Sequence, residues 1–341
     1  MEDYLSYMME QLQRLLAIDS PTGMTGAMTG YVMEEYRRLG YDPVKTRKGG
    51  VTVYLGGEGA GTMMLAHGDT LGAMVAEVKA DGRLRVVPLG GLNANNVETE
   101  NCRVYARDGR VVEGTIQLIN ASTHVNLAYQ DTARTFTTVE VVLDCDALSK
   151  EAVHALGIDN GCFVCLDPRT RIGSSGYIKS RFLDDKLCVA ILLAYAKYLK
   201  EEQITPRRAL YQYVTVFEEV GHGAASGIPA EVEEVISVDM GCVGQGLACT
   251  ERQVSICAKD LRGPYHYDVV QGLVSAAQAA GIDYAVDVFY SYSSDADMAM
   301  AAGVEARHGQ IGPGVYASHG YERAHIDGVR NTFELLKAYL G

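Results

Sequence analysis

Side chains of the types that hold metal ions follow several apolar stretches of this 341-residue chain. Three motifs come directly after runs predicted to be strands: His67-Gly68-Asp69, Glu218-Glu219 and Asp239. An imidazole nitrogen or a carboxylate oxygen can ligate a divalent cation, and a nearby carboxylate can orient the imidazole. A metal centre is therefore one interpretation of the pattern, beside ordinary turns and helix caps.

The Glu218-Glu219 pair is the most informative of these motifs. Two adjacent carboxylates at the end of a buried strand repel each other and lose hydration, which is unfavourable unless something positive lies between them. A metal ion would resolve this, with one Glu as a ligand and the other free to take a proton from water. A solvated turn is the alternative for this pair.

The other motifs each also have a structural explanation. His67-Gly68-Asp69 could form a surface turn, and Asp184-Asp185 could interact favourably with the dipole of the helix predicted after it. Asp239 could be a turn residue or a cap. The histidines near the C-terminus, taken singly, also fit structural roles: His308, His319 and His325.

Taken together, two His, two Asp and a Glu pair supply enough ligands for two adjacent divalent ions. A two-metal site stabilises attacking and leaving oxygens together and makes hydroxide available near neutral pH. Mixed histidine and carboxylate ligands suit Zn²⁺, Co²⁺ or Mn²⁺, and the residue types do not choose among them.

Helices and strands alternate along much of the chain. Apolar spacing predicts helices over 5–16, 28–39, 186–200, 265–280 and 329–340. Strands are predicted over 51–55, 62–66, 209–217, 235–238, 254–258 and 284–290. This alternation favours an α/β sandwich with a largely parallel sheet, in which ligands bind at the carboxyl ends of the strands.

A different pattern occupies residues 74–165. Asp81-Gly82 and Asp108-Gly109 separate runs of alternating polarity, which is typical of β-hairpins. We therefore predict a smaller, mostly β domain over 74–165, inserted into a discontinuous catalytic domain made of residues 1–73 and 166–341.

The composition limits the classes of partner. Hydrophobic residues make up 48% of the chain, which excludes a disordered protein. The net charge is −13, and no block of five or more Lys or Arg occurs, so we expect neither nucleic acid nor a membrane as partner. No apolar run approaches the roughly 18 residues of a membrane span.

The compartment follows from the start of the chain and from the cysteines. Met1-Glu2-Asp3 is acidic and lacks the basic, apolar pattern of a signal peptide. The eight cysteines are scattered, without a disulfide framework or a paired zinc motif. We expect a cytoplasmic protein in which Cys162 and Cys165 are buried or half-buried thiols.

The order of the His, Asp and Glu motifs along the chain resembles that of the dinuclear aminopeptidases of metallopeptidase clan MH. The nearest resemblance is to the glutamyl/deblocking aminopeptidase family, whose members build tetrahedral (TET) dodecamers. It covers essentially the whole chain and includes an inserted β module. The motifs that carry it are Leu15–Gly23, His67-Gly68-Asp69, Leu183–Lys186, Glu218–Gly221, Asp239 and Ser318-His319.

The resemblance implies a set of metal ligands. His67 and Asp239 would bind one cation, Glu219 and His319 the other, and Asp184 would bridge them. Two divalent ions per chain are expected, zinc or cobalt, with manganese as an alternative.

The resemblance also implies two catalytic roles. Asp69 would orient His67 through the ring nitrogen that does not bind metal. Glu218 would be the general base that moves a proton from the bridging water to the leaving amine, a contribution of roughly 10²–10⁴-fold to the rate.

The chain departs from the family pattern at several positions. The family usually has Arg where Lys186 stands, and Met and Glu where Gly68 and Thr70 stand. Tyr316 lies three residues before His319, where the family spacing is two. His325 is therefore an alternative to His319, and Asp185 is an alternative to Asp184.

The function implied by the resemblance is a metal-dependent aminopeptidase that removes the N-terminal residue from short peptides. It would act as a homo-oligomer built from dimers, up to a tetrahedral dodecamer, with the inserted domain serving dimerisation or substrate access. The segment Ser293–Asp297 resembles part of the family's substrate pocket, and a loop with a helix cap is its other interpretation.

Three other functions fit parts of the sequence. A related clan member could be an amino-acid deacylase or a carboxypeptidase. The fold could instead serve a non-catalytic assembly or binding protein, although such a protein would not need the crowded Glu218-Glu219 pair. Polysaccharide hydrolysis would use paired carboxylates but would leave the histidines unexplained.

Overall fold

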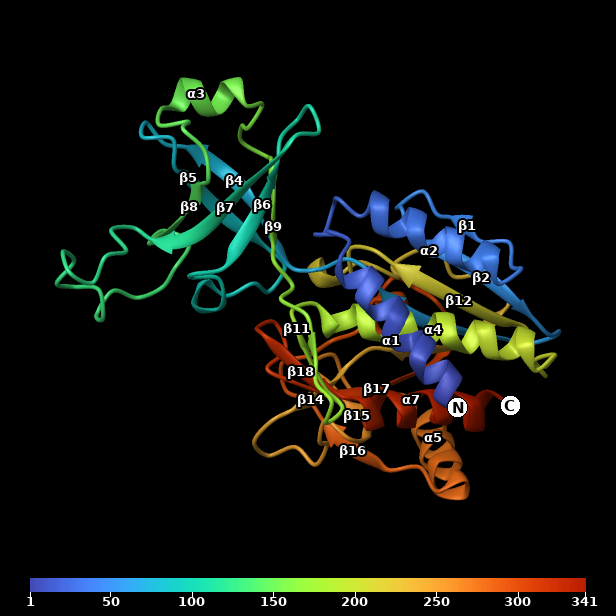
Figure 1. Ribbon diagram of the computed structural model, residues 1–341. Coiled ribbons are helices and arrows are strands. Elements are labelled where there is room, and N and C mark those ends of the chain that lie inside the picture. Colours follow the sequence, from blue (N-terminus) through green and yellow to red (C-terminus); the bar gives the residue numbers. More distant parts are fainter. The chain divides into compact units, whose positions relative to one another are not determined.

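The structure is a computed structural model that describes residues 1–341. The chain forms two compact units (Figure 1). The larger unit comprises residues 1–69 and 169–341, and the smaller unit comprises residues 70–168.

The larger unit is built on one twelve-stranded mixed sheet. Nine strands follow the order β1-β2-β12-β3-β13-β17-β18-β11-β10, and β14, β15 and β16 join through β17 and β15. The central strands β12, β3, β13 and β17 are parallel, which confirms the α/β class and the parallel core predicted from the sequence. The strands are β1 (Val44–Lys45), β2 (Val51–Gly56), β3 (Gly61–His67), β10 (Arg171–Ile172), β11 (Tyr177–Ser180), β12 (Leu210–Thr215), β13 (Val232–Val238), β14 (Gly241–Val243), β15 (Val254–Lys259), β16 (Tyr284–Val288), β17 (Arg307–Tyr316) and β18 (Glu322–His325).

Strand β3 lies in the middle of the sheet and is buried along its whole length. A strand covered on both faces must be apolar nearly throughout, which explains the run 63–66. Since β3 ends at His67, the last buried position of the strand carries an imidazole to the carboxyl edge of the sheet.

Helices pack against this sheet and against one another. Helix α4 contacts β3 and β17, and α1 lies beside α4 (Figure 1). No helix combines the length and the apolarity that crossing a lipid bilayer requires. The helices of the larger unit are α1 (Glu2–Leu16), α2 (Gly26–Arg38), α4 (Leu183–Glu201), α5 (Tyr267–Ala280), α6 (Asp295–Ala301) and α7 (Ile326–Leu340), with the short 3₁₀ helix η2 (Glu218–Val220).

The long strand β17 was not predicted, because its glycines and a proline interrupt the apolar pattern. These glycines allow close backbone approach. A Cβ at Gly312 would lie 1.8 Å from the carbonyl oxygen of Asp239, and one at Gly314 would lie 2.2 Å from that of Thr250. The main-chain N–H of Asp239 donates to the carbonyl of Ile311 at 2.9 Å, so β17 fixes the backbone of this candidate ligand.

The smaller unit is a closed β-barrel with the strand order β4-β5-β8-β7-β6-β9. Its hairpins turn at Asp81-Gly82 and Asp108-Gly109, and both flanking pairs are antiparallel. Cys162 and Cys165 are buried and form no disulfide. Its elements are β4 (Gly72–Val78), β5 (Leu84–Leu89), the 3₁₀ helix η1 (Ala94–Asn96), β6 (Asn101–Tyr105), β7 (Val111–Leu118), β8 (Val139–Leu143), α3 (Lys150–Ala155) and β9 (Phe163–Leu166).

A buried polar cluster lies where the segment after β15 meets α6 and β17. The hydroxyl of Tyr265 lies 3.2 Å from Asp260 Oδ2, 3.0 Å from Asp297 Oδ2 and 3.2 Å from Gln310 Oε1. Burial, together with the neighbouring Asp297, raises the pKa of Asp260 to about 7 from its usual 3.8. The folded protein therefore keeps a proton on Asp260 at pH values where the unfolded chain has released it.

This proton gives a testable pH dependence. A carboxyl whose pKa is raised on folding destabilises the protein progressively as pH rises from about 4 to about 7. Asp260→Asn cannot ionise, so its free energy of unfolding relative to that of the wild type should increase across this range and then level off. Urea denaturation at several pH values measures the difference. Asp268→Asn, on the exposed face of α5, is the control, and a pH-independent difference for Asp260→Asn would contradict the account.

Candidate metal centre

One edge of the sheet in the larger unit collects the candidate residues. Parallel strands β3, β12 and β13 end there, as expected for ligand sites in such sheets. His67 is the last residue of β3, and Asp184 lies at the start of α4. Glu218 and Glu219 lie in η2 after β12, and Asp239 follows β13. His319 lies in the loop between β17 and β18.

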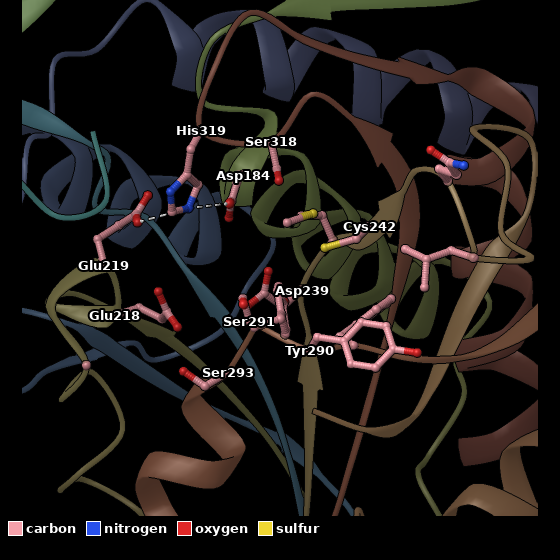
Figure 2. Close-up of a pocket in the computed structure, with 16 residues that line it drawn as sticks. Asp184, Glu218, Glu219, Asp239, Cys242, Tyr290, Ser291, Ser293, Ser318 and His319 are labelled. Atoms are coloured by element: carbon pink, nitrogen blue, oxygen red, sulfur yellow. Dashed lines mark ion pairs between the residues drawn. The ribbon is translucent and has the colours of Figure 1, made fainter. Parts of the chain in front are cut away.

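Two groups of three side chains have ligand atoms within 4.8 Å of one another. One group is His67, Asp184 and Asp239, and the other is Asp184, Glu219 and His319. Asp184 belongs to both: its Oδ1 lies 3.0 Å from His67 Nε2, and its Oδ2 lies 3.4 Å from His319 Nε2. Figure 2 shows His319 between Glu219 and Asp184. The two oxygens of the Asp184 carboxylate thus face two separate groups of potential metal ligands, called groups of donors.

The two alternative ligands lie elsewhere. Asp185 Oδ2 accepts a hydrogen bond of 3.2 Å from the main-chain N–H of His67. His325 Nε2 lies 3.0 Å from the carbonyl oxygen of Ser175, and its Nδ1 accepts from the N–H of Asp327 at the start of α7. Neither residue belongs to a group of potential ligands, so the geometry favours Asp184 and His319.

Asp69 connects His67 to the glutamate pair. The main-chain carbonyl oxygen of Asp69 lies 3.0 Å from His67 Nδ1, whereas its carboxylate lies 3.7 Å from the same atom. The carboxylate instead accepts hydrogen bonds from the N–H groups of Glu218 and Glu219, at 3.2 and 3.4 Å, and from the hydroxyl of Thr22 at 2.7 Å. Asp69 therefore orients the imidazole through its main chain and holds the glutamate turn through its side chain.

The segment after α1 supports the same site. Ser20 Oγ donates to the carbonyl of Gly68 at 2.7 Å, and the buried Lys186 Nζ donates to the carbonyls of Leu15 and Ile18 at 3.0 and 2.6 Å. The segment is thus tied both to the turn after β3 and to the start of α4. These bonds fix the segment 15–20 against two elements that carry candidate ligands.

Carboxylates outnumber positive groups in the site. Burial raises the pKa of Glu218 and of Glu219 well above its usual range, and it raises the pKa of Asp239 to about 7. The carboxylates around them add to this effect. In one of the two groups of candidate ligands, Asp239 Oδ1 is buried and has no hydrogen-bond partner. Buried carboxylate oxygens in this condition are ones that a cation would satisfy.

The two histidines respond to the same charge. Burial disfavours the charged form of His67, but the carboxylates of Glu218 and Asp184 outweigh it and raise the pKa of His67. Burial also lowers the pKa of His319, but the carboxylate of Asp184 outweighs it and the pKa rises to about 10. Without a metal, protons are the cations that these carboxylates recruit.

Glu322 was not recognised in the sequence as part of the site. Its buried carboxylate accepts the main-chain N–H of Asp184 at 3.2 Å and that of His319 at 3.1 Å. His319 has a left-handed backbone with φ of +62°. Glu322 therefore fixes the backbones of both residues. Nothing in the sequence distinguishes this glutamate from a solvated loop residue.

The segment Ser293–Asp297 combines a helix cap with a support for the site. Ser294 and Asp297 form a capping box at the start of α6. The buried carboxylate of Asp295 accepts the hydroxyl of Thr215 at the end of β12 and, at 2.7 Å, the N–H of Ala224. Asp295 thus holds the chain on both sides of η2, and Ser293 reaches the pocket described next.

A pocket of about 650 Å³ opens over the two groups of donors (Figure 2). Its charged lining residues all come from the carboxylate and histidine cluster. The rest of the lining is neutral, and it includes the aromatic residues of the segment 289–292. The lining residues are Asp184, Glu218, Glu219, Gly221, Asp239, Met240, Cys242, Gln245, Leu247, Phe289, Tyr290, Ser291, Tyr292, Ser293, Ser318 and His319.

Comparison with known proteins identifies the family. Residues 49–335 match the family described as M42 glutamyl aminopeptidase. The chain is also 40% identical over 334 residues to a putative aminopeptidase, YhfE, of Bacillus subtilis, which covers 97% of this chain and 96% of that protein. The chain belongs to the M42 glutamyl aminopeptidase family.

This membership confirms the resemblance found in the motifs and places the M42 chain among the aminopeptidases, which hydrolyse peptide bonds. Two solved structures share its fold. An aminopeptidase from Desulfurococcus kamchatkensis has a TM-score of 0.88 at 22% identity and covers 99% of this chain and 95% of its own. The TET1 peptidase of Pyrococcus horikoshii, described as assembling into a tetrahedron or a large octahedral shell, has a TM-score of 0.86 at 20% identity, covering 98% and 99%.

The choice between His319 and His325 can be tested by cation binding. We expect His319→Asn to lower the zinc stoichiometry of the chelator-treated protein from two per chain to one, because only His319 faces the carboxylate cluster. Asn tolerates a left-handed backbone at position 319 and caps a helix well at position 325. His325→Asn is therefore the matched control and should keep both sites. Isothermal titration calorimetry measures both variants, and the reverse result would assign the ligand to His325.

Proposed function

We propose that this chain is a metal-dependent aminopeptidase that hydrolyses the first peptide bond of short peptides, using two divalent cations and Glu218 as general base. One observation carries the proposal: Asp184 belongs to two groups of donors, while Glu218 lies beside them and outside both. Glu218 Oε2 is 3.7 Å from His67 Nε2. This arrangement has the parts that a two-cation hydrolase needs.

The donor set fits two small divalent cations. Each group offers one imidazole and two carboxylates, a mixture that suits zinc or cobalt, with manganese as the alternative. In the proposed assignment His67 and Asp239 hold one cation, Glu219 and His319 hold the other, and Asp184 contacts both. The unpartnered buried Oδ1 of Asp239 supports this assignment.

When bound, two such cations polarise the scissile carbonyl and lower the pKa of a water molecule. Glu218 faces the pocket and is free to take the proton of the attacking water and give it to the leaving amine nitrogen. Asp69 holds the main chain of Glu218, so the base is fixed relative to the imidazole of His67. Peptide-bond cleavage would then require both cations, the attacking water and a scissile carbonyl placed beside Glu218.

The charge of the pocket favours the amino end of a peptide. Four carboxylates line it, and no Lys or Arg does. A protonated N-terminal amine is attracted to such a site, whereas a C-terminal carboxylate finds no cationic side chain to bind it. This contrast supports an aminopeptidase over the carboxypeptidase and deacylase alternatives. The intact cluster likewise argues against a purely non-catalytic binding protein.

The role of Glu218 is testable by substitution. Glu218→Gln should keep its bound metal but lose about 10²–10⁴-fold in kcat on aminoacyl substrates, because Gln cannot take up a proton. Steady-state kinetics and metal analysis by mass spectrometry measure the two effects separately. Glu58→Gln, at an exposed turn, should leave both unchanged. A near-normal rate for Glu218→Gln would remove this residue from the mechanism.

We further propose a homo-oligomer built from dimers, up to a tetrahedral dodecamer, in which residues 70–168 serve dimerisation or substrate access. The description of the Pyrococcus horikoshii relative supports this assembly. Apolar side chains on the connection between β7 and β8 also support it, since Val125 is 69% and Leu127 is 98% exposed. Exposed apolar groups of this kind favour a protein contact.

The assembly gives its own prediction. Light scattering of the purified protein should give twelve times the 36.9 kDa mass of one chain. Leu127→Asp should lower that mass, because it places a charge in the proposed contact. Asn160→Asp, at an exposed polar position of the smaller unit, is the control. A monomer at all concentrations would contradict the proposal.

We place the activity in the cytoplasm. None of the eight cysteines forms a disulfide, which supports a reducing compartment.

A further inference from the structure

The pocket over the metal centre has two unlike ends. Its charged residues belong to the carboxylate and histidine cluster, and its uncharged lining, which we call the neutral end, includes Met240, Leu247, Phe289, Tyr290 and Tyr292. In Figure 2, Tyr290 lies on the side away from Glu218 and Glu219. This second end offers apolar and aromatic surface without any charge.

We infer that the neutral end binds the side chain of the substrate's N-terminal residue and selects uncharged apolar or aromatic side chains. The inference rests on the proposed function, because it assumes that the N-terminal amine lies at the charged end. With the amine held there, a side chain on the adjacent α-carbon can extend into the neutral end of the same pocket. Its wall therefore determines the preferred residue.

The aromatic wall of this subsite is rigid. Phe289 is 2% exposed and packs edge-on against Tyr292, with ring centroids 5.3 Å apart. The hydroxyl of Tyr292 accepts a hydrogen bond of 2.7 Å from Gln310 Nε2 on β17. The ring of Tyr292 is thus held from the sheet below, and it presents a fixed apolar face.

The part of the lining that carries Leu247 is held from a different strand, β16. The buried carboxylate of Asp287, on β16, accepts the main-chain N–H groups of Ala248 and Cys249 at 2.7 and 2.9 Å. These bonds fix the loop that carries Leu247 next to the segment that begins at Phe289. A subsite whose walls are ordered before binding loses little conformational entropy when a side chain enters.

The charges exclude acidic and basic side chains. No Lys or Arg lines the pocket, so a glutamyl or aspartyl side chain would lose its hydration without gaining a partner. All four lining carboxylates belong to the proposed metal centre, so a lysyl side chain in the neutral end would meet only the neutral Gln245, hydroxyls and apolar groups. The chain should therefore differ from the glutamyl preference that its family description names.

The first test is a panel of fluorogenic aminoacyl substrates with the metal-loaded wild-type protein. We expect kcat/KM for leucyl, methionyl and phenylalanyl substrates to exceed that for glutamyl and lysyl substrates by about 100-fold or more, as for charges buried without partners. A glutamyl or lysyl substrate that is cleaved as well as the leucyl one would overturn the inference.

The second test changes the wall itself. Leu247→Arg places a cation in the neutral end and should raise the ratio of glutamyl to leucyl kcat/KM by at least about 10-fold. Val44→Arg, 62% exposed on β1, adds the same charge outside the pocket and is the matched control. An unchanged ratio in Leu247→Arg would show that this end does not contact the side chain.

A binding measurement separates this inference from the proposed function. Calorimetry of metal-loaded Glu218→Gln protein with the dipeptides Leu-Gly, Glu-Gly and Lys-Gly ranks the side chains without any turnover. Tightest binding of Leu-Gly supports the subsite even if no substrate is hydrolysed. Absence of hydrolysis would defeat the proposed function and leave the subsite standing. Tightest binding of Glu-Gly or Lys-Gly defeats the subsite even if hydrolysis is fast, and no binding of any dipeptide defeats both.

Discussion

The crowding of buried carboxylates around Asp184 is the constraint on which the rest of the structure depends. Carboxylates this close repel one another and lose hydration, and the two nearby histidines cannot neutralise them all. The site is therefore stable only if cations are recruited, either as protons or as metal ions. In the proposed function, the same carboxylates recruit the cations and leave the pocket without a Lys or Arg that could bind a C-terminal carboxylate.

The fold serves this constraint by fixing the backbone on which the carboxylates are carried. Three parallel strands end at the site, and the close approach that Gly312 allows lets β17 hold the main chain of Asp239. Asp69 and Glu322 use their carboxylates to bind main-chain N–H groups of the proposed base, Glu218, and of three proposed ligands. These bonds hold like charges together that would otherwise separate.

Much of this arrangement can be predicted from the sequence. The remainder cannot, and the reasons are physical. Strand ends that carry His67, Glu218-Glu219 and Asp239 are predictable, because a buried strand is apolar up to the residue that leaves the core. Strand β17 could not be predicted, because its glycines allow close contacts between backbones and so interrupt the apolar pattern of a strand. Glu322 could not be predicted for a similar reason: its partners are main-chain groups of Asp184 and His319, and such contacts leave no residue pattern. The barrel of the smaller unit closes through pairings of β9 with β4 and β6, which local hairpin signals do not encode.

The central claim, that this cluster holds two cations that share Asp184, is tested most directly by anomalous diffraction from crystals of the zinc-loaded protein. Data collected at the zinc absorption edge should show two peaks per chain, with Asp184 contacting both and Glu218 contacting neither. A single peak, no peak at this cluster, or two peaks that do not share Asp184 would contradict the account.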